Sequence, residues 1–511
     1  MLSEHDILSI PEASRWASAY LSRNVLQSNI NYLIQYAKIN KILRDGIACV
    51  SVLELKNYYD SNSRNKSQNP LSFANLREAD TTKHVHRLHP YKGKFIPQLA
   101  EYFLDSHTDE LKKEVYFYKG DWVLDPFCGS GTTLVQANEL GINAIGVDIS
   151  EFNSLIASCK TRGIDLAYLS RVIDRITELL AVFVQESGIL QFDEELTAKL
   201  ADFDSKYFPT VEYKASVRDK KIKEREYAAE KEREFLKIYE KLTKKYNVRL
   251  QNENSDTFMN KWFLPNIIEE LKFVAGLIEK INQTEIRNML TLILSRTMRS
   301  CRATTHSDLA TLIEPMRTTY YCIKHFKICK PLFSILKWWK TYSKDAVERL
   351  AAFDKLRTDT KQICLTEDSR SIDLDSVLRG KKIDGVFSSP PYVGMIDYHE
   401  QHAYAYDLFG LPRNDESEIG PLCKGRGTEA KESYVIGVSD VLINCKKYMK
   451  PDYNVFLVAN DKYGLYPKIA SRAGMKIIEL FNRPVINRTE KDKNPYSETI
   501  FHMIDNGDAN D

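Results

Sequence analysis

A strand, a glycine-rich turn and a second strand that ends in an acid constrain the fold of this chain more than any other feature. Residues 122–124 (Trp-Val-Leu) form a predicted strand, and residues 125–133 (Asp-Pro-Phe-Cys-Gly-Ser-Gly-Thr-Thr) form a turn that opens a helix. Glycines let backbone N–H groups approach a ligand, and a helix N-terminus favours a carboxylate. The next strand, residues 144–148, ends in Asp148, where an acid can accept hydrogen bonds from ribose hydroxyls. The pattern predicts an α/β sheet that binds a nucleoside-bearing ligand at its carboxyl edge.

A second turn follows another predicted strand, at residues 383–387. Two serines end that strand, and the two prolines after them prevent both continued pairing and the start of a helix. Ser389 and the carbonyl group of Pro390 are therefore held rigidly at the carboxyl edge of the sheet, with Tyr392 just beyond. Two aligned hydrogen-bond acceptors beside an aromatic face suit a planar base that carries an exocyclic amine.

The tetrapeptide Ser389-Pro390-Pro391-Tyr392 resembles the catalytic motif of the DNA amino-methyltransferases, which methylate exocyclic amines with S-adenosylmethionine. Serine in the first position resembles the cytosine-N4 branch, whereas the adenine-N6 branch more often has Asp or Asn there. The resemblance implies that Tyr392 stacks on a target base flipped out of the duplex. It also implies that Ser389 and the Pro390 carbonyl accept hydrogen bonds from the amine, which orients its lone pair toward the methyl group.

Three further segments resemble this family. The run from His89 to Pro97 resembles the family segment that closes over the methionine end of the cofactor, and Asp148 lies where its ribose-binding acid belongs. Asp368 resembles the acid that receives the adenine amine. By this resemblance the residues that contact S-adenosylmethionine are Tyr91, Lys94, Phe95, Pro97, Asp125, Pro126, Phe127, Gly129, Ser130, Gly131, Thr132, Thr133, Asp148, Asp368 and Ser369.

Residues 1–62 are expected to form a separate module of two helices, a strand-like wing and a third helix. The pattern resembles the winged helix-turn-helix of the MerR and excisionase type, which implies that one helix faces a DNA major groove, where Asn and Gln can pair with base edges. The alternative is a helical hairpin that docks on the main domain or on a partner. The DNA-contacting residues implied by the resemblance are Asn29, Asn31, Tyr32 and Gln35.

A long, mostly helical stretch separates the two halves of the predicted sheet. Residues 213–250 are densely charged with mixed signs, which is typical of a solvated helix face or an antiparallel arm. Arg296, Arg299 and Arg302 recur at three-residue spacing and are expected to share one side of a helix. Such a stripe could follow DNA phosphates or could be a solvated edge. Family variants with an internal target-recognition domain usually place it after the motif that receives the adenine amine, which is Asp368 here. In this chain the insert lies before Asp368.

Several reactive side chains are interpreted as packing residues. Cys128 lies in the cofactor turn, and the Pro-Cys dipeptide of the cytosine-C5 enzymes is missing, so it is read as a small loop filler. His86 and His89 are three residues apart, but no Cys or acid completes a ligand set there. His399 and His402, also three residues apart, are interpreted as lining or packing the catalytic loop. The nine cysteines contain no CxxC pair, which argues against structural zinc and against a secreted disulfide framework. We therefore expect no metal.

Charge and hydropathy give weaker constraints. Lys plus Arg number 72 against 70 Asp plus Glu, so any nucleic-acid surface must come from local clustering. The first residues are acidic and do not form a signal peptide, and no apolar run is long enough to cross a membrane. A cytoplasmic protein is expected.

The predicted fold class is α/β: a doubly wound, mainly parallel seven-stranded Rossmann-like methyltransferase sheet with a large helical insert and a small N-terminal winged helix-turn-helix module. The predicted order is the N-terminal module, a linker, the cofactor half of the core, the helical insert and the catalytic half of the core. These segments comprise residues 1–62, 63–84, 85–155, 156–360 and 361–511.

The sequence as a whole predicts a site-specific DNA methyltransferase that acts on cytosine N4 in duplex DNA. Its expected partner is a separate cognate restriction endonuclease, because the chain carries no convincing nuclease motif of its own. Three alternatives remain open: the same fold acting on adenine N6, an enzyme that methylates an RNA base or a protein amide, and a DNA-binding regulator with an inactive core.

Overall fold

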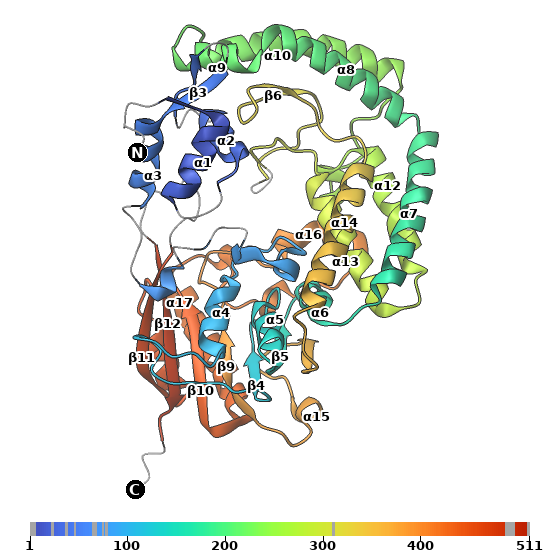
Figure 1. Cartoon of the computed structure of the whole chain (residues 1–511). Coiled ribbons are helices and arrows are strands. Elements are labelled where there is room, and N and C mark those ends of the chain that lie inside the picture. The colour runs from blue at the N-terminus through green and yellow to red at the C-terminus, as the bar shows by residue number, and fades with distance from the viewer. Residues whose placement is uncertain are drawn as a thin grey trace. The chain divides into compact units, whose positions relative to one another are not determined.

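The computed structural model describes residues 7–21, 25–35, 39–44, 47–63, 69–73, 76, 80–308, 312–485 and 496–507 (Figure 1). The chain divides into two compact units. One comprises Met1–Asn75 and Arg483–Tyr496, and the other Leu76–Asn482 and Ser497–Asp511. The first unit therefore extends past the predicted limit at residue 62 and takes in a segment from near the C-terminus.

The larger unit is built on a seven-stranded sheet with the order β11-β12-β10-β9-β4-β5-β8. The pairs β4–β5, β5–β8, β4–β9 and β9–β10 are parallel, and β12 runs antiparallel to β10. The predicted seven-stranded, mainly parallel sheet is confirmed. The strands are β4 (Trp122–Asp125), β5 (Asn143–Asp148), β8 (Gln362–Thr366), β9 (Ile383–Ser388), β10 (Met449–Ala459), β11 (Met475–Pro484) and β12 (Ser497–Asp505).

The strand order changes direction at β4. The chain goes from β4 to β5 on one side and, after the insert, returns to place β9 on the other side. Val123 pairs with Gly385 and Leu124 with Val386, so the two strands end at the same edge. In open α/β sheets a ligand crevice forms at such a switch point, outside the carboxyl ends of the strands. The two turns singled out in the sequence therefore open into one place.

Side chains that alternate along the central strands cover both faces of the sheet. Phe387 and Phe456 point to one face, where their rings pack against Phe103. Val386 and Val455 point to the other face and belong to a cluster with α17 and α18. Burial on both faces explains why these strands are nearly continuous apolar runs. The covering helices are α4 (Pro97–Leu104) and α5 (Thr132–Glu139) on the first face and α17 (Thr428–Lys446) and α18 (Tyr466–Arg472) on the second.

The described residues of the insert between β5 and β8 form α-helices and one small hairpin, joined by loops. Helices α8 and α10 contact each other along the far part of the insert (Figure 1). In α10, Phe235, Tyr239 and Leu242 are buried, which gives the charged stretch one apolar stripe and leaves most of its charges in solvent. The insert contains α6 (Glu151–Thr161), α7 (Leu166–Glu186), α8 (Ile189–Tyr207), α9 (Thr210–Arg218), α10 (Glu224–Lys245), α11 (Phe258–Trp262), α12 (Pro265–Glu279), α13 (Thr284–Ser300), β6 (Tyr320–Cys322), β7 (Lys327–Cys329) and α14 (Leu336–Asp354).

Two short helices, α15 (Asp375–Leu378) and α16 (Ala403–Phe409), belong to the catalytic half of the core. Among the described residues, none of the helices combines the length and the apolar character needed to cross a membrane.

In the smaller unit the described residues form three α-helices and a three-stranded antiparallel sheet with the order β1-β3-β2. Its first helix is capped by Ser9, whose backbone N–H and hydroxyl both donate to the Glu12 carboxylate (2.9 and 2.6 Å). The elements are β1 (Ile7–Ser9), α1 (Ile10–Tyr20), α2 (Gln27–Gln35), β2 (Ile42–Arg44), β3 (Ile47–Ser51) and α3 (Val52–Ser63). The three helices and β3 follow the order expected from the sequence, whereas β1 and β2 were not expected. The winged helix-turn-helix identity stays a prediction.

Glu270, in α12, is a buried acid that joins two parts of the insert. Its Oε2 atom accepts hydrogen bonds from the Ile335 backbone N–H (2.8 Å) and the Ser334 hydroxyl (3.0 Å). Burial raises the pKa of Glu270 from 4.5 to about 7. Between these values the folded chain keeps a proton that the unfolded chain has lost, so the folded state loses stability as the pH rises from 4.5 to 7.

We predict that Glu270→Gln removes this pH dependence. Relative to the variant, the wild type should lose up to about 3 kcal/mol of unfolding free energy between pH 4.5 and 7. Urea unfolding followed by tryptophan fluorescence at the two pH values measures the difference. Glu279→Gln, the same change at an exposed position of the same helix, is the control. An equal pH dependence in the wild type and the Glu270 variant would contradict the prediction.

Candidate active site

A pocket lies at the carboxyl edge of the sheet and encloses about 800 Å³ of empty space, part of it open to solvent. Its walls come from the turn after β4, the end of β5, the turn after β8, the turn after β9 and two loops. The predicted residues that line it are Tyr91, Lys94, Phe95, Asp125, Pro126, Phe127, Gly129, Ser130, Thr132, Asp148, Asp368, Ser369, Ser389 and Pro391.

The glycine-rich turn fits closely around its neighbours. Gly129 has a φ of +48°, and a Cβ atom there would lie 2.8 Å from the Tyr91 hydroxyl oxygen. Gly131 has a φ of +74°, and a Cβ atom there would lie 2.8 Å from the Ala157 Cβ atom of α6. The first glycine keeps the pocket floor open beside Tyr91. The second lets the start of α5 pack against α6.

Asp148 is held by three hydrogen-bond donors. Its Oδ2 atom accepts from the Gly129 N–H (2.8 Å), and its Oδ1 atom accepts from the Ser150 N–H (2.9 Å) and the Asn153 side-chain amide (3.1 Å). Burial raises the pKa of this carboxyl group. A carboxylate has about four acceptor positions, so the three donors fix its orientation and leave acceptor capacity on Oδ2.

Asp125 connects the two turns. The Ser388 hydroxyl at the end of β9 donates to its Oδ1 atom (2.5 Å), as does the Phe127 N–H (3.3 Å). Burial raises the pKa of Asp125 to about 6. Beside it, the Thr133 hydroxyl donates to the Phe387 carbonyl (3.2 Å). The cofactor-type turn and the Ser-Pro-Pro-Tyr turn are thus joined by buried hydrogen bonds that the sequence does not reveal.

The turn after β8 forms another wall. Arg370 pairs with Asp368 through Nε to Oδ1 (2.9 Å) and Nη2 to Oδ2 (2.5 Å). Burial opposes ionisation of Asp368, but the bonds from Arg370 outweigh it and lower the pKa of the carboxyl group. The Ser369 hydroxyl donates to the Pro126 carbonyl (2.7 Å), which attaches this turn to the glycine-rich turn.

Three predicted cofactor-binding residues do not line the pocket. Pro97 begins α4, Gly131 is the N-cap of α5, and Thr133 lies within the first turn of that helix. Their positions shape the turns around the pocket instead. Of the predicted catalytic residues, Pro390 is buried and Tyr392 lies outside the pocket lining, where its hydroxyl donates to Glu498 of β12 (3.1 Å).

Two lysines donate to backbone carbonyl groups beside the turns, and burial lowers the pKa of both ammonium groups. The ammonium group of Lys94 donates to the His86 carbonyl (2.7 Å), and burial lowers its pKa to about 8. Lys160, fully buried in α6, donates to the Ser130 carbonyl (2.6 Å). Sequence reasoning missed Lys160, because one lysine in an amphipathic helix carries no signal of burial. Cys128 is also buried beside this turn, and burial raises the pKa of its thiol well above the usual range.

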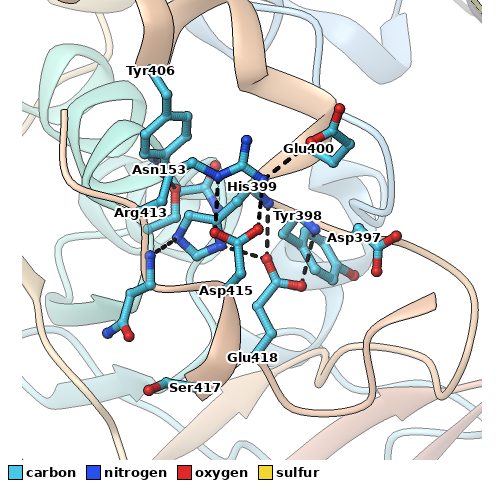
Figure 2. Close-up of polar contacts among 12 residues, drawn as sticks. Asn153, Asp397, Tyr398, His399, Glu400, Tyr406, Arg413, Asp415, Ser417 and Glu418 are labelled. Carbon is cyan, nitrogen blue, oxygen red and sulfur yellow. Dashed lines mark hydrogen bonds and ion pairs between the residues drawn. The ribbon is translucent and has the colours of Figure 1, made fainter. Parts of the chain in front are cut away.

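One wall of the pocket, formed by the loop that follows the Ser-Pro-Pro-Tyr turn, was not predicted. Figure 2 shows its polar network, in which the buried His399 Nδ1 atom lies 2.5 Å from Glu418 Oε1. Glu418 also accepts from the backbone N–H groups of His399 (2.9 Å) and Tyr398 (3.2 Å). Nearby, Arg413 donates to Asp415 (2.5 and 2.9 Å). Glu418 has no recognisable motif around it, and its link to His399 spans 19 positions, so only the folded loop reveals it.

Further residues that were not predicted also line the pocket. They are Gly93, Cys128, Ile149, Asn153, Glu367, Tyr398, Ser417, Glu418, Ile419 and Val441.

The predicted arginine stripe is largely engaged within the protein. Arg296 forms an ion pair with Asp345 and lies over the Tyr342 ring. The expectation that all three arginines share one side of a helix is wrong for Arg302, because α13 ends at Ser300. Arg302 is buried and lies over Tyr404. Arg299 is half-buried.

The residues predicted to contact DNA in the smaller unit lie on α2. Asn29 and Asn31 are exposed, and Asn29 Oδ1 accepts the Leu26 N–H (2.9 Å). The side chains of Tyr32 and Gln35 lie outside the described residues.

Comparison with known proteins agrees with the class that the sheet and pocket indicate. Residues 22–158 match the family model N6_N4_Mtase, described as DNA methylase. The type II methyltransferase M.MjaII of Methanocaldococcus jannaschii is 42% identical over 523 residues, covering 97% of each chain. M.MvaI of Kocuria varians is 33% identical over 141 residues, covering 27% of this chain and 28% of that protein. This chain belongs to the type II DNA methyltransferases.

A solved rRNA methyltransferase, AviRa from Streptomyces viridochromogenes, aligns over 82% of this chain and 88% of that chain. Its sequence identity is 11% and its TM-score 0.26, which is too low to bear on fold or activity.

Membership of the family implies an S-adenosylmethionine-type methyl donor. The pocket residues fit such a donor, because Gly129 leaves room that a Cβ atom would fill and two acids face the same space.

We predict that Gly129→Ala weakens binding of the methyl donor by about tenfold or more. An alanine at this φ is strained by about 1–2 kcal/mol, and its Cβ atom displaces Tyr91 from the pocket floor. Isothermal titration of the purified protein with S-adenosylmethionine measures the change. Gly276→Ala, in α12 and with no heavy atom within 4 Å of the added Cβ, is the control. Unchanged affinity in the Gly129 variant would contradict this assignment of the pocket floor.

Proposed function

We propose that this enzyme transfers a methyl group from S-adenosylmethionine to the N4 amine of cytosine in duplex DNA. The observation that carries the proposal is the convergence of two turns. Ser389 and Pro391 line the same pocket as the glycine-rich turn and Asp148, and β4 and β9, which bear these turns, are paired neighbours. The serine that opens the Ser-Pro-Pro-Tyr turn favours cytosine over adenine.

The lining residues have suitable chemistry for each part of the donor. Asp148 has acceptor capacity for ribose hydroxyls, and Asp368 can accept a hydrogen bond from an adenine amine. Lys94 and the N-terminus of α5 favour the donor's carboxylate. These assignments orient the methyl group toward the turn after β9.

The residues of that turn orient the target amine. Ser389 and the Pro390 carbonyl accept its hydrogen bonds, which draws the nitrogen lone pair out of conjugation and directs it at the methyl carbon. Tyr392, whose hydroxyl is held by Glu498, supplies a face on which the flipped cytosine stacks. The donor supplies a sulfonium-activated methyl group. A nitrogen–carbon bond forms as the sulfur–carbon bond breaks, and the amine releases one proton.

Adenine N6 is the second candidate, because the matched family model spans both amine classes. Incubation with duplex DNA and labelled S-adenosylmethionine, followed by digestion to nucleosides and mass spectrometry, distinguishes the two. We expect labelled N4-methylcytosine. Labelled N6-methyladenine would retain the fold and the pocket but overturn the inference drawn from Ser389.

We predict that Ser389→Ala lowers the turnover rate at least about 100-fold, the scale on which loss of one preorganised hydrogen-bonding group acts in catalysis. Affinity for S-adenosylmethionine should change little, because the serine acts on the target amine. Single-turnover methylation and donor titration give the two readouts. Ser471→Ala, an exposed serine at the end of α18, is the matched control. A variant that keeps its rate would remove Ser389 from the mechanism.

We further propose that α2 of the smaller unit reads the target DNA and that a separate restriction endonuclease cleaves the unmodified site. Asn31 is the best-placed residue for base contact, because it is exposed, whereas Asn29 accepts a local backbone hydrogen bond. An asparagine amide can pair with the N6 and N7 atoms of adenine in the major groove.

Asn31→Ala is expected to cost about 1–3 kcal/mol of specific DNA binding, or roughly 5- to 150-fold in affinity. Fluorescence anisotropy measures specific binding with a duplex that carries the sequence the enzyme methylates. A scrambled duplex gives the non-specific binding. Asn57→Ala, an exposed asparagine on α3, is the control. Equal affinities would indicate that α2 contacts something other than the bases.

A further inference from the structure

Four side chains with metal-binding atoms meet at the small hairpin of the insert. They are Cys322 at the end of β6, His325 in the turn, Cys329 at the end of β7, and His306 from the segment after α13. The four candidate ligand atoms all lie within 4.8 Å of one another. Both cysteines are buried and free, His306 is half-buried, and His325 is exposed.

The spacing of these atoms is that of a tetrahedral site. Zinc binds thiolate sulfur at about 2.3 Å and imidazole nitrogen at about 2.0–2.1 Å, so tetrahedral geometry separates sulfur from nitrogen by about 3.6 Å. Cys322 Sγ lies 3.6 Å from His306 Nδ1 and 3.5 Å from His325 Nδ1. Cys329 Sγ lies 3.6 Å from His325 Nδ1. Three sulfur–nitrogen separations therefore have the expected length at once.

The strand register explains how the cysteines meet. Tyr320 pairs with Cys329 and Cys322 with Lys327, so the side chains of Tyr320, Cys322 and Cys329 project from the same face of the hairpin. Its turn passes through Phe326, which has a φ of +56°. This turn brings His325 over the same face, where its Nδ1 atom contacts both sulfurs.

The face of the hairpin that bears the cysteines has only a small apolar cluster of its own among the described residues. Each strand has three residues, and its own apolar cluster comprises Tyr320, Cys322 and Cys329, with Met316 packed against them. A two-stranded hairpin of this size is marginally stable in water by itself. Its other face packs against the helices of the insert through Ile328 and Tyr321. Polar contacts add to this packing: the Ile328 N–H donates to Asp204 of α8 (3.0 Å), and the Tyr321 hydroxyl donates to Glu224 of α10 (2.9 Å).

We propose that His306, Cys322, His325 and Cys329 form a structural zinc site. Four protein ligands complete a tetrahedral shell, and a closed Cys₂His₂ set is typical of a structural rather than a catalytic zinc. The metal would connect the segment after α13 to the hairpin, and through it to α8 and α10. The Tyr320 hydroxyl lies 2.8 Å from His306 Nδ1, and metal binding through that nitrogen exchanges this hydrogen bond for the metal bond.

This proposal departs from the sequence-based expectation of no metal. The expectation rested on the missing CxxC pair, whereas the ligands here follow a Cys-x₂-His-x₃-Cys pattern plus one distant histidine.

The test is the zinc content of the full-length protein, purified under reducing conditions without chelator and measured by inductively coupled plasma mass spectrometry. We expect about one zinc per chain, and near zero in the Cys322→Ser/Cys329→Ser double variant. Cys423→Ser, at an exposed cysteine outside the cluster, should keep its zinc. Equal zinc content in the double variant, or no zinc in the wild type after incubation with excess zinc and gel filtration, overturns the proposal.

A second measurement uses only the wild-type protein and so does not depend on whether the double variant folds. Cobalt exchanged into the wild-type protein should give the intense visible bands of a tetrahedral site and the near-ultraviolet charge-transfer band of cobalt–thiolate bonds. A weak octahedral spectrum without the charge-transfer band would refute the site. A Cys322–Cys329 disulfide, detected by mass spectrometry as a loss of two hydrogens from the non-reduced protein, would refute it as well.

Discussion

The pairing of β4 with β9 is the contact on which the catalytic half of this enzyme depends. It sets Leu124 beside Val386, and the Ser388 hydroxyl then reaches the Asp125 carboxylate across 263 positions of sequence. Both strands end in rigid turns, one bent by glycines at positive φ and one fixed by two prolines. Two stiff turns on paired strands have a fixed separation. Under the proposed function, this fixed separation holds the methyl donor at one turn and the target amine at the other.

The helical insert also packs against segments that surround the pocket. His89, from the segment before the cofactor strand, has its Nε2 atom 3.1 Å from the Ser295 hydroxyl of α13. Arg302, just past the end of that helix, lies over Tyr404 of α16. One helix of the insert thus contacts segments on both sides of the pocket. Substitutions of the arginines near its C-terminal end act on the packing around the pocket as well as on any surface offered to DNA.

Polar groups support the structure where apolar packing is thin. The loop after the catalytic turn is held by the buried His399–Glu418 contact rather than by a sheet or a long helix. The cysteine-bearing face of the insert hairpin has four candidate ligand atoms within 4.8 Å beside a small apolar cluster. In both places a contact joins segments that no local sequence pattern connects: His399 with Glu418, and His306 with the hairpin.

The sequence by itself determined the elements and the chemistry that is local to them. Alternating and continuous apolar runs predicted all seven strands of the sheet, because burial on one or both faces leaves a short-range pattern. The glycine-rich turn was recognisable because backbone at positive φ favours glycine. The Ser-Pro-Pro-Tyr turn was recognisable because its two prolines fix the backbone geometry.

Only the tertiary structure decided which distant groups meet. The pairing of Glu418 with His399, the burial of Lys160 behind the turn, the engagement of Arg296 by Asp345 and the approach of His306 to the hairpin all depend on how helices and loops pack. A charged or metal-binding side chain looks the same in sequence whether it faces solvent or a partner. Its role is set by the position and dielectric environment that packing gives it.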